Sequence, residues 1–381
     1  MAIRVNPQLI DELEAYGAED VSKCYHCGNC SAMCPFSQGD TIFPRRAMRQ
    51  LQLGLEERLQ GNLDPWLCYY CGECSEECPR DAEPGETMMS LRRWLTARYD
   101  WTGIARAFYR SWKTEVLAVV VTALLTGIAF LLWGFSQGSI GDYDGANAFL
   151  PASKVHIFDW ALAGVLLFFL LSNCGRMWWF TLGKDERTRF AVGSYLRRLY
   201  LLPAHFFTQM RYAKCTRKRP WAVHLVLMLS YVTMLVLIMF FLRYMASGPA
   251  VDWRVHAFGL TAAAGLLATT IWALRGRIKK TETHYRHSHE SDWMFLILLI
   301  VVTSTGVLQF ALHRSGFDTA ANIAYVIHLM GVVPMLGLEV PFGKWAHLAY
   351  RPLAMYFAAV QADALRARER SQVPVGAAQT A

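Results

Sequence analysis

Long apolar runs begin near residue 116 and continue to about residue 343, whereas the first hundred residues are largely polar. A helix needs about 20 apolar residues to cross the hydrocarbon core of a bilayer. Six runs reach that length. The pattern therefore predicts six membrane-spanning helices, at 116–135, 155–177, 221–243, 255–274, 292–312 and 321–343.

The segments outside these runs divide the rest of the chain. No strand alternation appears in the first hundred residues, and the stretch from Pro44 to Gly54 begins and ends as helices do. Residues 101–115 mix aromatic and basic side chains, which is typical of a helix at the level of the lipid headgroups. We expect four parts: a polar domain at 1–100, an interfacial linker at 101–115, a six-span membrane domain at 116–350 and a tail at 351–381.

Charge in the loops predicts the orientation. The loop 178–220 carries ten Lys or Arg and the loop 275–291 carries five, whereas each loop on the other side carries one: Lys154, Arg254 and Arg314. Cytoplasmic loops are the basic ones. We therefore expect a multi-pass protein of the cytoplasmic (inner) membrane with both termini in the cytoplasm. The net charge of +8 then reflects topology and contact with anionic lipid, and nucleic acid is not an expected partner.

Eight of the ten cysteines fall in two motifs near the N-terminus. Each motif reads C-x2-C-x2-C-x3-C-P, starting at Cys24 and at Cys68. In this spacing three thiolates of one turn hold a cubane, and the fourth ligates the other cluster of a pair. The spacing predicts one [4Fe-4S] cluster on Cys24, Cys27, Cys30 and Cys78, and a second on Cys68, Cys71, Cys74 and Cys34.

The glycine and proline positions of the two motifs also favour iron–sulfur clusters. Gly28 and Gly72 allow the loop to approach a cluster without a Cβ, and Pro35 and Pro79 turn the chain away after the last ligand. A pair of zinc sites is the alternative, but zinc sites separate two cysteine pairs by a longer gap. The sequence thus predicts an all-α fold: an α-helical dicluster ferredoxin domain followed by a six-helix transmembrane bundle of the cytochrome b type.

Histidines in or near the spans are candidate haem ligands, because neutral imidazole is the usual axial ligand of a b haem. They are His156, His224, His256, His328 and His347, with His313 at the outer end of the fifth span. A haem with two histidine ligands needs them at equal depth on different helices. Packing or interface roles are the alternative for each of these residues.

Depth in the membrane sorts these histidines. His224 begins the third span and His347 follows the sixth, so together they predict an inner haem b. His328 lies in the outer half of the sixth span and predicts an outer haem b. Pro334, Gly337 and Pro341, which lie between His328 and His347, are expected to kink the sixth span. Glu339 in the same span is expected either to bond a neighbour or to relay protons.

Both halves of the chain resemble known redox proteins. The N-terminal region resembles the C-type component of heterodisulfide reductase, over residues 20–28, 44–54 and 66–74. The membrane half resembles the haem b gamma subunit of respiratory nitrate reductase and the E-type component of heterodisulfide reductase, most clearly over 328–331, 341–342 and 347–352. The fusion of the two modules is similar to the C-type components of quinone-modifying oxidoreductase (Qmo) complexes.

The resemblance implies two [4Fe-4S] clusters, two b haems and a menaquinone site. It also implies two flavin-containing soluble partner subunits, of the A and B types, adenylylsulfate reductase as a redox partner, and sulfate respiration as the setting. The gamma-subunit pattern has a histidine where this chain has Met234. The outer haem then recruits His156, His256 or His313, uses Met234, or is absent.

From the resemblance we assign His156 as the second outer haem ligand beside His328, and Arg254 and His256 as quinone contacts. The expected function is electron transfer between a quinone and soluble partner subunits, with no substrate chemistry beyond the quinone. Two alternatives are a cluster-bearing membrane anchor without haem, and the equivalent subunit of a heterodisulfide reductase or sulfite-reduction complex. The two remaining cysteines, Cys174 and Cys215, are expected to be inert thiols.

Overall fold

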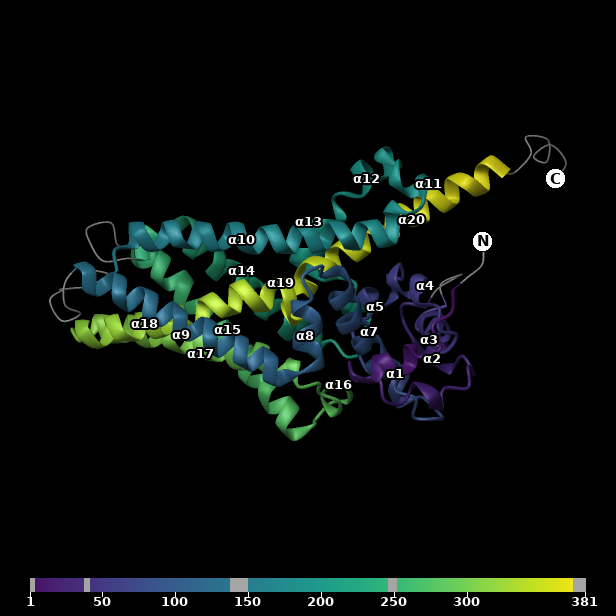
Figure 1. Ribbon diagram of the computed structural model, residues 1–381, viewed down its shortest axis with the longest axis horizontal. Helices are drawn as coiled ribbons and strands as arrows, with labels where there is room; N and C mark the ends of the chain where they lie inside the picture. Colours follow the sequence, from purple (N-terminus) through teal and green to yellow (C-terminus); the bar gives the residue numbers. More distant parts are fainter. Residues whose placement is uncertain (1–3, 38–41, 138–149, 246–251, 373–381) are drawn as a thin grey trace. The chain divides into compact units, whose positions relative to one another are not determined.

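The computed structural model describes residues 4–37, 42–137, 150–245 and 252–372 (Figure 1). Every regular element among these residues is a helix, which confirms the predicted all-α fold. The chain forms two units. We call Met1–Trp101, Ser172–Thr216 and His347–Ala381 the cysteine unit, and Thr102–Leu171 with Arg217–Ala346 the membrane unit.

Short helices build the cysteine unit. Its N-terminal helices are α1 (Leu9–Glu14), α2 (Asn29–Met33), α3 (Arg45–Gln52), α4 (Glu56–Gln60), α5 (Asp64–Leu67), α6 (Glu73–Glu76) and α7 (Pro84–Tyr99). Its later helices are α11 (Glu186–Arg189), α12 (Val192–Arg198), α13 (Leu201–Thr208) and α20 (His347–Gln372). The predicted helix after Pro44 is α3, and it ends just before Gly54.

The core of the cysteine unit joins the N-terminal helices to α20. Trp66, Tyr99 and Tyr350 are fully buried, and the Trp66 and Tyr350 rings lie 4.9 Å apart between their centres. A buried ion pair joins Arg93 to Glu86 within α7, at 3.0 Å. Packed aromatic rings bury large apolar areas, so α20 is part of this core.

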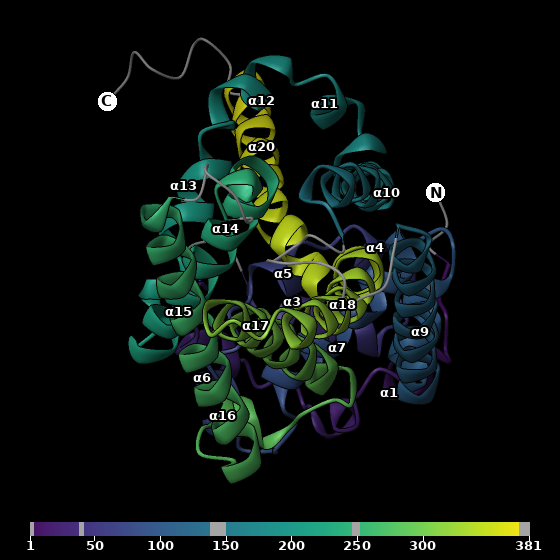
Figure 2. The ribbon, with the colours of Figure 1, turned by 90° about the vertical axis from the view of Figure 1, so that its left-hand side faces the viewer.

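Six long helices make up most of the membrane unit: α9 (Trp112–Gln137), α10 (Ala152–Trp178), α14 (Arg219–Met245), α15 (Trp253–Lys279), α17 (Ser291–Arg314) and α18 (Asp318–Pro334). Two short helices, α8 (Ile104–Arg110) and α16 (Thr283–Arg286), flank them. α14 packs on α15, α15 on α17, α17 on α18, and α18 on α9 (Figure 2).

These helices confirm the six predicted spans. Each contains an apolar window long enough to cross a bilayer, and the windows have mean hydropathy between 1.6 and 2.7. Only 6% of the window in Lys154–Gly183 is buried within the protein, so its apolar side chains face outward. In water such a surface would be unfavourable, whereas in a bilayer it meets lipid. The chain is a multi-pass membrane protein.

The sixth span is interrupted. α18 ends at Pro334, and a π-helical segment, Met335–Glu339, separates it from the short helix α19 (Val340–Phe342). Proline lacks an amide hydrogen and cannot continue the helical bonding pattern. The interruption falls where the prolines predict a kink, so His328 and His347 do not share one continuous helix.

Candidate functional site

Both cysteine motifs turn at a glycine in the left-handed backbone conformation. Gly28 has a φ of 90° and Gly72 a φ of 89°, a region that is costly for residues with a side chain. A short helix follows each glycine directly. Cys30 lies on α2 and Cys74 on α6, and these two helices pack together. The repeated motif therefore forms two similar loops in contact.

Four cysteines line one small cavity, and we call this group the buried cysteine site. Cys68, Cys71 and Cys74 come from the second motif, and Cys34 is the last cysteine of the first. Burial raises the pKa of Cys34 to about 12, and the neighbouring thiols of Cys68 and Cys71 add to the shift. The structure therefore brings together the four cysteines that the spacing assigns to the second cluster.

The other four cysteines form the exposed cysteine site. Burial raises the pKa of Cys30 to about 11, and the adjacent thiols of Cys24, Cys27 and Cys78 contribute to this shift. Cys27 itself is exposed to solvent. The backbone amide of Ala82 donates to Cys78 Sγ at 3.4 Å. The grouping again crosses the two motifs, because Cys78 belongs to the second.

At each cysteine site a backbone amide donates to a sulfur. A similar amide bond reaches the buried site, where the Tyr70 amide donates to Cys68 Sγ at 3.3 Å. Hydrogen bonds to the sulfurs are among the contacts that set the potential of an iron–sulfur cluster. Within the described ranges, no three His, Cys, Asp or Glu side chains are arranged to hold a single metal ion.

Arginines surround the buried cysteine site. The guanidinium of Arg92 donates to the carbonyl oxygens of Pro65, at 2.5 Å, and of Cys68. Arg351 donates to the same Cys68 carbonyl at 3.2 Å, and its guanidinium lies 4.5 Å from the centre of the Tyr69 ring. Positive charge beside a cluster stabilises its reduced, more negative form. Arg351 belongs to the stretch 347–352 that resembles the membrane family, but nothing in the sequence links it to the cysteines, which lie far away along the chain.

His347 belongs to this same region. It begins α20 four residues before Arg351, and residues four apart lie on one face of a helix. Arg351 reaches the backbone of Cys68. The predicted inner haem ligand is therefore one helical turn from a residue that bonds a cluster cysteine. His224 lies in α14 of the membrane unit, so its pairing with His347 stays a prediction.

A ninth thiol lies at the buried cysteine site. Cys215 is 1% exposed, and its side chain is within hydrogen-bonding reach of the Cys71 thiol. Next to it, the Thr216 amide donates to a carboxylate oxygen of Glu73 at 3.0 Å, which ties this segment to the second motif. From the sequence, Cys215 is expected to be an inert thiol. Its contact with Cys71 could not be predicted, because Cys215 lies far from both motifs along the chain.

We expect Cys215→Ala to lower the midpoint potential of one cluster and leave the other unchanged. A thiol that donates to a cluster thiolate stabilises the reduced state. A bond worth about 1 kcal/mol corresponds to roughly 40 mV for a one-electron couple. Redox titration followed by electron paramagnetic resonance measures the shift, with Cys174→Ala as the control. Identical potentials in the Cys215 variant and the native protein would contradict the contact.

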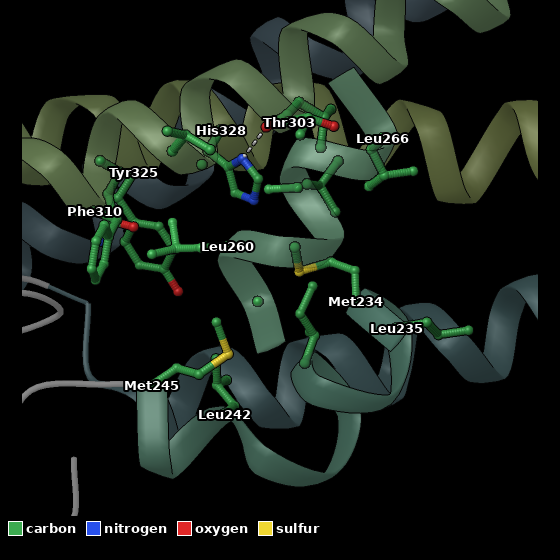
Figure 3. A pocket seen from close by; sticks show the side chains of 18 of the residues that line it. Met234, Leu235, Leu242, Met245, Leu260, Leu266, Thr303, Phe310, Tyr325 and His328 are labelled. Atoms are coloured by element: carbon green, nitrogen blue, oxygen red, sulfur yellow. Dashed lines mark hydrogen bonds between the residues drawn. The ribbon is translucent and has the colours of Figure 1, made fainter. Parts of the chain in front are cut away.

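An apolar cavity of about 330 Å³ lies within the membrane unit, between α14, α15, α17 and α18. Its size falls in the range of small-molecule sites, roughly 300–1,000 Å³. Leucine, valine, isoleucine and methionine side chains line most of its wall (Figure 3). Its polar lining includes Thr303, Gln309, Arg314, Tyr231, Tyr325, His256, His313 and His328.

One ring nitrogen of His328 is fixed by hydrogen bonding. Nδ1 lies 3.0 Å from the carbonyl oxygen of Val302 and therefore donates to it; the Thr305 hydroxyl is 3.2 Å from the same nitrogen. The proton on Nδ1 leaves Nε2 as the ring's lone-pair nitrogen. Histidines that ligate metals commonly have this arrangement. His328 is therefore suited to bind an iron in the cavity, with Met234 also in the wall (Figure 3).

Of the remaining predicted site residues, one lines the cavity and two do not. His256 lines the cavity, and its ring centre is 5.1 Å from that of Phe310. Arg254 is exposed and is not among the cavity's lining residues. His156 accepts a hydrogen bond from the Trp160 indole at 3.1 Å and is likewise outside the described cavity wall. The structure thus brings His328 together with His256 and Met234, and not with His156.

Comparison with known proteins supports the N-terminal half of this picture. Residues 20–82 match the 4Fe-4S dicluster domain family. A protein from Archaeoglobus profundus, described as like the C-type component of heterodisulfide reductase, is 36% identical over 93 residues, which is 24% of this chain and 48% of that protein. The chain therefore covers about half the length of this relative. No solved structure matches the chain. The protein thus joins a region that matches the 4Fe-4S dicluster domain family to six helices able to span a membrane, a combination suited to electron transfer at a membrane.

Proposed function

We propose that this chain passes electrons between a menaquinone-type quinone in the membrane and soluble partner subunits. The observation that carries the proposal is His328, whose Nδ1 is bonded to Val302 at 3.0 Å and whose ring lines an apolar cavity within the membrane unit. A second unit of the same chain holds two cysteine sites. A haem b in the cavity would supply a one-electron carrier inside the bilayer.

The two cysteine sites are suited to exchange electrons with different neighbours. Cys27 of the exposed site is open to solvent, and Tyr25 beside it is 70% exposed. A soluble partner can approach this site closely. The buried site is covered by Arg351 of α20, one turn from His347. We propose that the exposed cluster exchanges electrons with the partner, and that the buried cluster is the one on the haem side of the electron path.

The quinone end of the path needs residues that hold an apolar ring and its oxygens. His256 and His313 line the cavity together with Arg314, and each can donate a hydrogen bond to a quinone oxygen. In this proposal the haem binds beside His328 and Met234, and the quinone ring binds where His256, His313 and Arg314 line the wall, at the start of α15 and the end of α17. Arg254 is exposed near the start of α15 and in this proposal guides the quinone headgroup toward the cavity.

The resemblance of both halves to known redox proteins extends the proposal. We propose that the chain lies in the cytoplasmic membrane with both termini in the cytoplasm, as the basic loops predict. Its proposed partners, from the resemblance, are flavin-containing subunits of the A and B types and adenylylsulfate reductase. In that setting the electrons serve dissimilatory sulfur metabolism. A cluster-bearing anchor without haem is the second candidate, favoured by the hydrogen bond from Trp160 to His156, which lies outside the described cavity wall.

A haem and iron count tests the proposal. We would purify the chain in detergent with its partner subunits and record dithionite-reduced minus oxidised visible spectra, together with a pyridine haemochrome count. We expect b-type haem bands, about eight cluster irons per chain, and reoxidation of the bands by a short-chain menaquinone analogue. Cluster iron without haem would overturn the quinone path and support the anchor.

A further inference from the structure

Two buried carboxyl groups meet in the membrane unit. Glu115 lies in the first turn of α9, and Glu339 is the last residue of the π segment. Each is 1% exposed. Ionisable side chains are costly within a membrane span and usually have a function there. Neither is part of the cavity wall or of the cysteine sites.

A glycine close to Glu339 leaves space for its carboxyl group. The helix is interrupted after Pro334, and the π segment ends at Glu339. A Cβ added to Gly343 would overlap with the carboxylate oxygen Oε2 of Glu339. Glycine at position 343 is therefore needed for this carboxyl group to lie where it does.

Three of the four carboxyl oxygens of Glu115 and Glu339 have no donor among the described residues. In the described part of the chain, Oε1 and Oε2 of Glu339 and Oε1 of Glu115 are buried without a hydrogen-bond partner. Each of the two carboxyl groups lies within hydrogen-bonding reach of the other. Two carboxylates at such a distance, away from water, cannot both be ionised. A proton held between them satisfies both groups at once.

The charged side chains near Glu115 and Glu339 do not neutralise these two carboxyl groups. Asp292 of α17 is the other acidic group that acts on Glu115. It is itself paired, with Lys344 Nζ at 2.5 Å and with Arg277 at 3.5 Å. The cations contributed by the neighbouring elements thus neutralise Asp292. They leave the two glutamates to share a proton.

We propose that Glu115 and Glu339 form a proton-binding site inside the membrane unit, with one proton bridging the two carboxyl groups. The π segment that carries Glu339 also contributes Met335 and Leu336 to the wall of the cavity. A change of charge in the cavity therefore acts on the pair through a single turn of chain. A carrier that gains an electron in the cavity raises the affinity of the pair for its proton, and one that loses an electron lowers it, a coupling that rests on the proposed quinone function.

Infrared spectroscopy of the purified full chain at neutral pH tests the bound proton without quinone or haem. A protonated carboxyl group has a carbonyl band that shifts in heavy water, and we expect one such band that is lost in both Glu339→Gln and Glu115→Gln. Glu290→Gln, at an exposed carboxylate before α17, should keep it. Absence of any such band in the native protein would overturn the site even where a variant does not fold.

Redox-difference spectra separate the site from its coupling. We expect the carboxyl band to change when the protein is reduced with a menaquinol analogue, and this change to be missing in Glu339→Gln. A band that is present but unchanged by reduction would overturn the coupling and leave the proton site standing. A chain with no haem and no response to quinol but with the static band would refute the proposed function alone.

Discussion

Replacing Cys34 by alanine should remove the cluster of the second motif and leave the cluster of the first. Cys34 belongs to the first motif by sequence, yet it lines one cavity with Cys68, Cys71 and Cys74. A [4Fe-4S] cluster needs four thiolates, so the buried site loses its cluster and the iron content falls from about eight to about four per chain. Iron and sulfide analysis measures the loss.

Electron paramagnetic resonance identifies which cluster is lost. The signal missing from Cys34→Ala should be the one missing from Cys71→Ala, and Cys78→Ala should instead match Cys27→Ala. Cys174→Ala controls for the loss of a cysteine outside both motifs. If Cys34→Ala and Cys27→Ala lost the same signal, each motif would hold its own cluster, and the exchange of the fourth ligand would be wrong.

The membrane spans and the helical fold were predictable because their signals are local. An apolar run of about 20 residues can span a bilayer only as a helix, and each of the six runs contains its own signal. The interruption of the sixth span is local too, since Pro334 and Pro341 lack the amide hydrogen that helical bonding uses and favour a kink or break. Such features need no knowledge of the rest of the fold.

The surroundings of the buried cysteine site were not predictable, because they come from distant segments. Arg351 bonds the Cys68 carbonyl across 283 positions of sequence, and Cys215 reaches Cys71 from another segment of the cysteine unit. Neither residue type is unusual where it stands. Only the packing of α20 and of residues 172–216 in the cysteine unit turns them into neighbours of a cluster.

Which histidines face each other could not be predicted from the sequence either. Depth along a span suggests which histidines can meet, and His328, selected in this way, lines the cavity. Rotation about the helix axis decides which of them face each other, and spacing along one helix does not fix that rotation relative to another. His156 bonds Trp160 of its own helix instead. Met234, which takes the place of a histidine in the resembled pattern, lines the cavity.

His328→Ala should abolish haem binding in the membrane cavity, whereas His156→Ala should leave it intact. His328 has Nδ1 bonded to Val302 and its ring in the cavity wall, so it is preorganised to offer Nε2 to an iron. His156 is engaged with Trp160 and is absent from the described wall. The haemochrome count per chain, taken at equal cluster iron, measures the loss. Equal haem content in both variants would contradict a haem in the cavity. Loss of haem in His156→Ala alone would support His156, the ligand expected from the sequence.

The second ligand of that iron can be tested by a change in potential. A methionine ligand raises the potential of a haem relative to two histidines. If Met234 is the second ligand, Met234→His should therefore keep the haem and lower its midpoint potential, which a redox titration of the visible bands measures. An unchanged potential would show that the iron takes its second ligand elsewhere, with His256 as the next residue of the wall to replace.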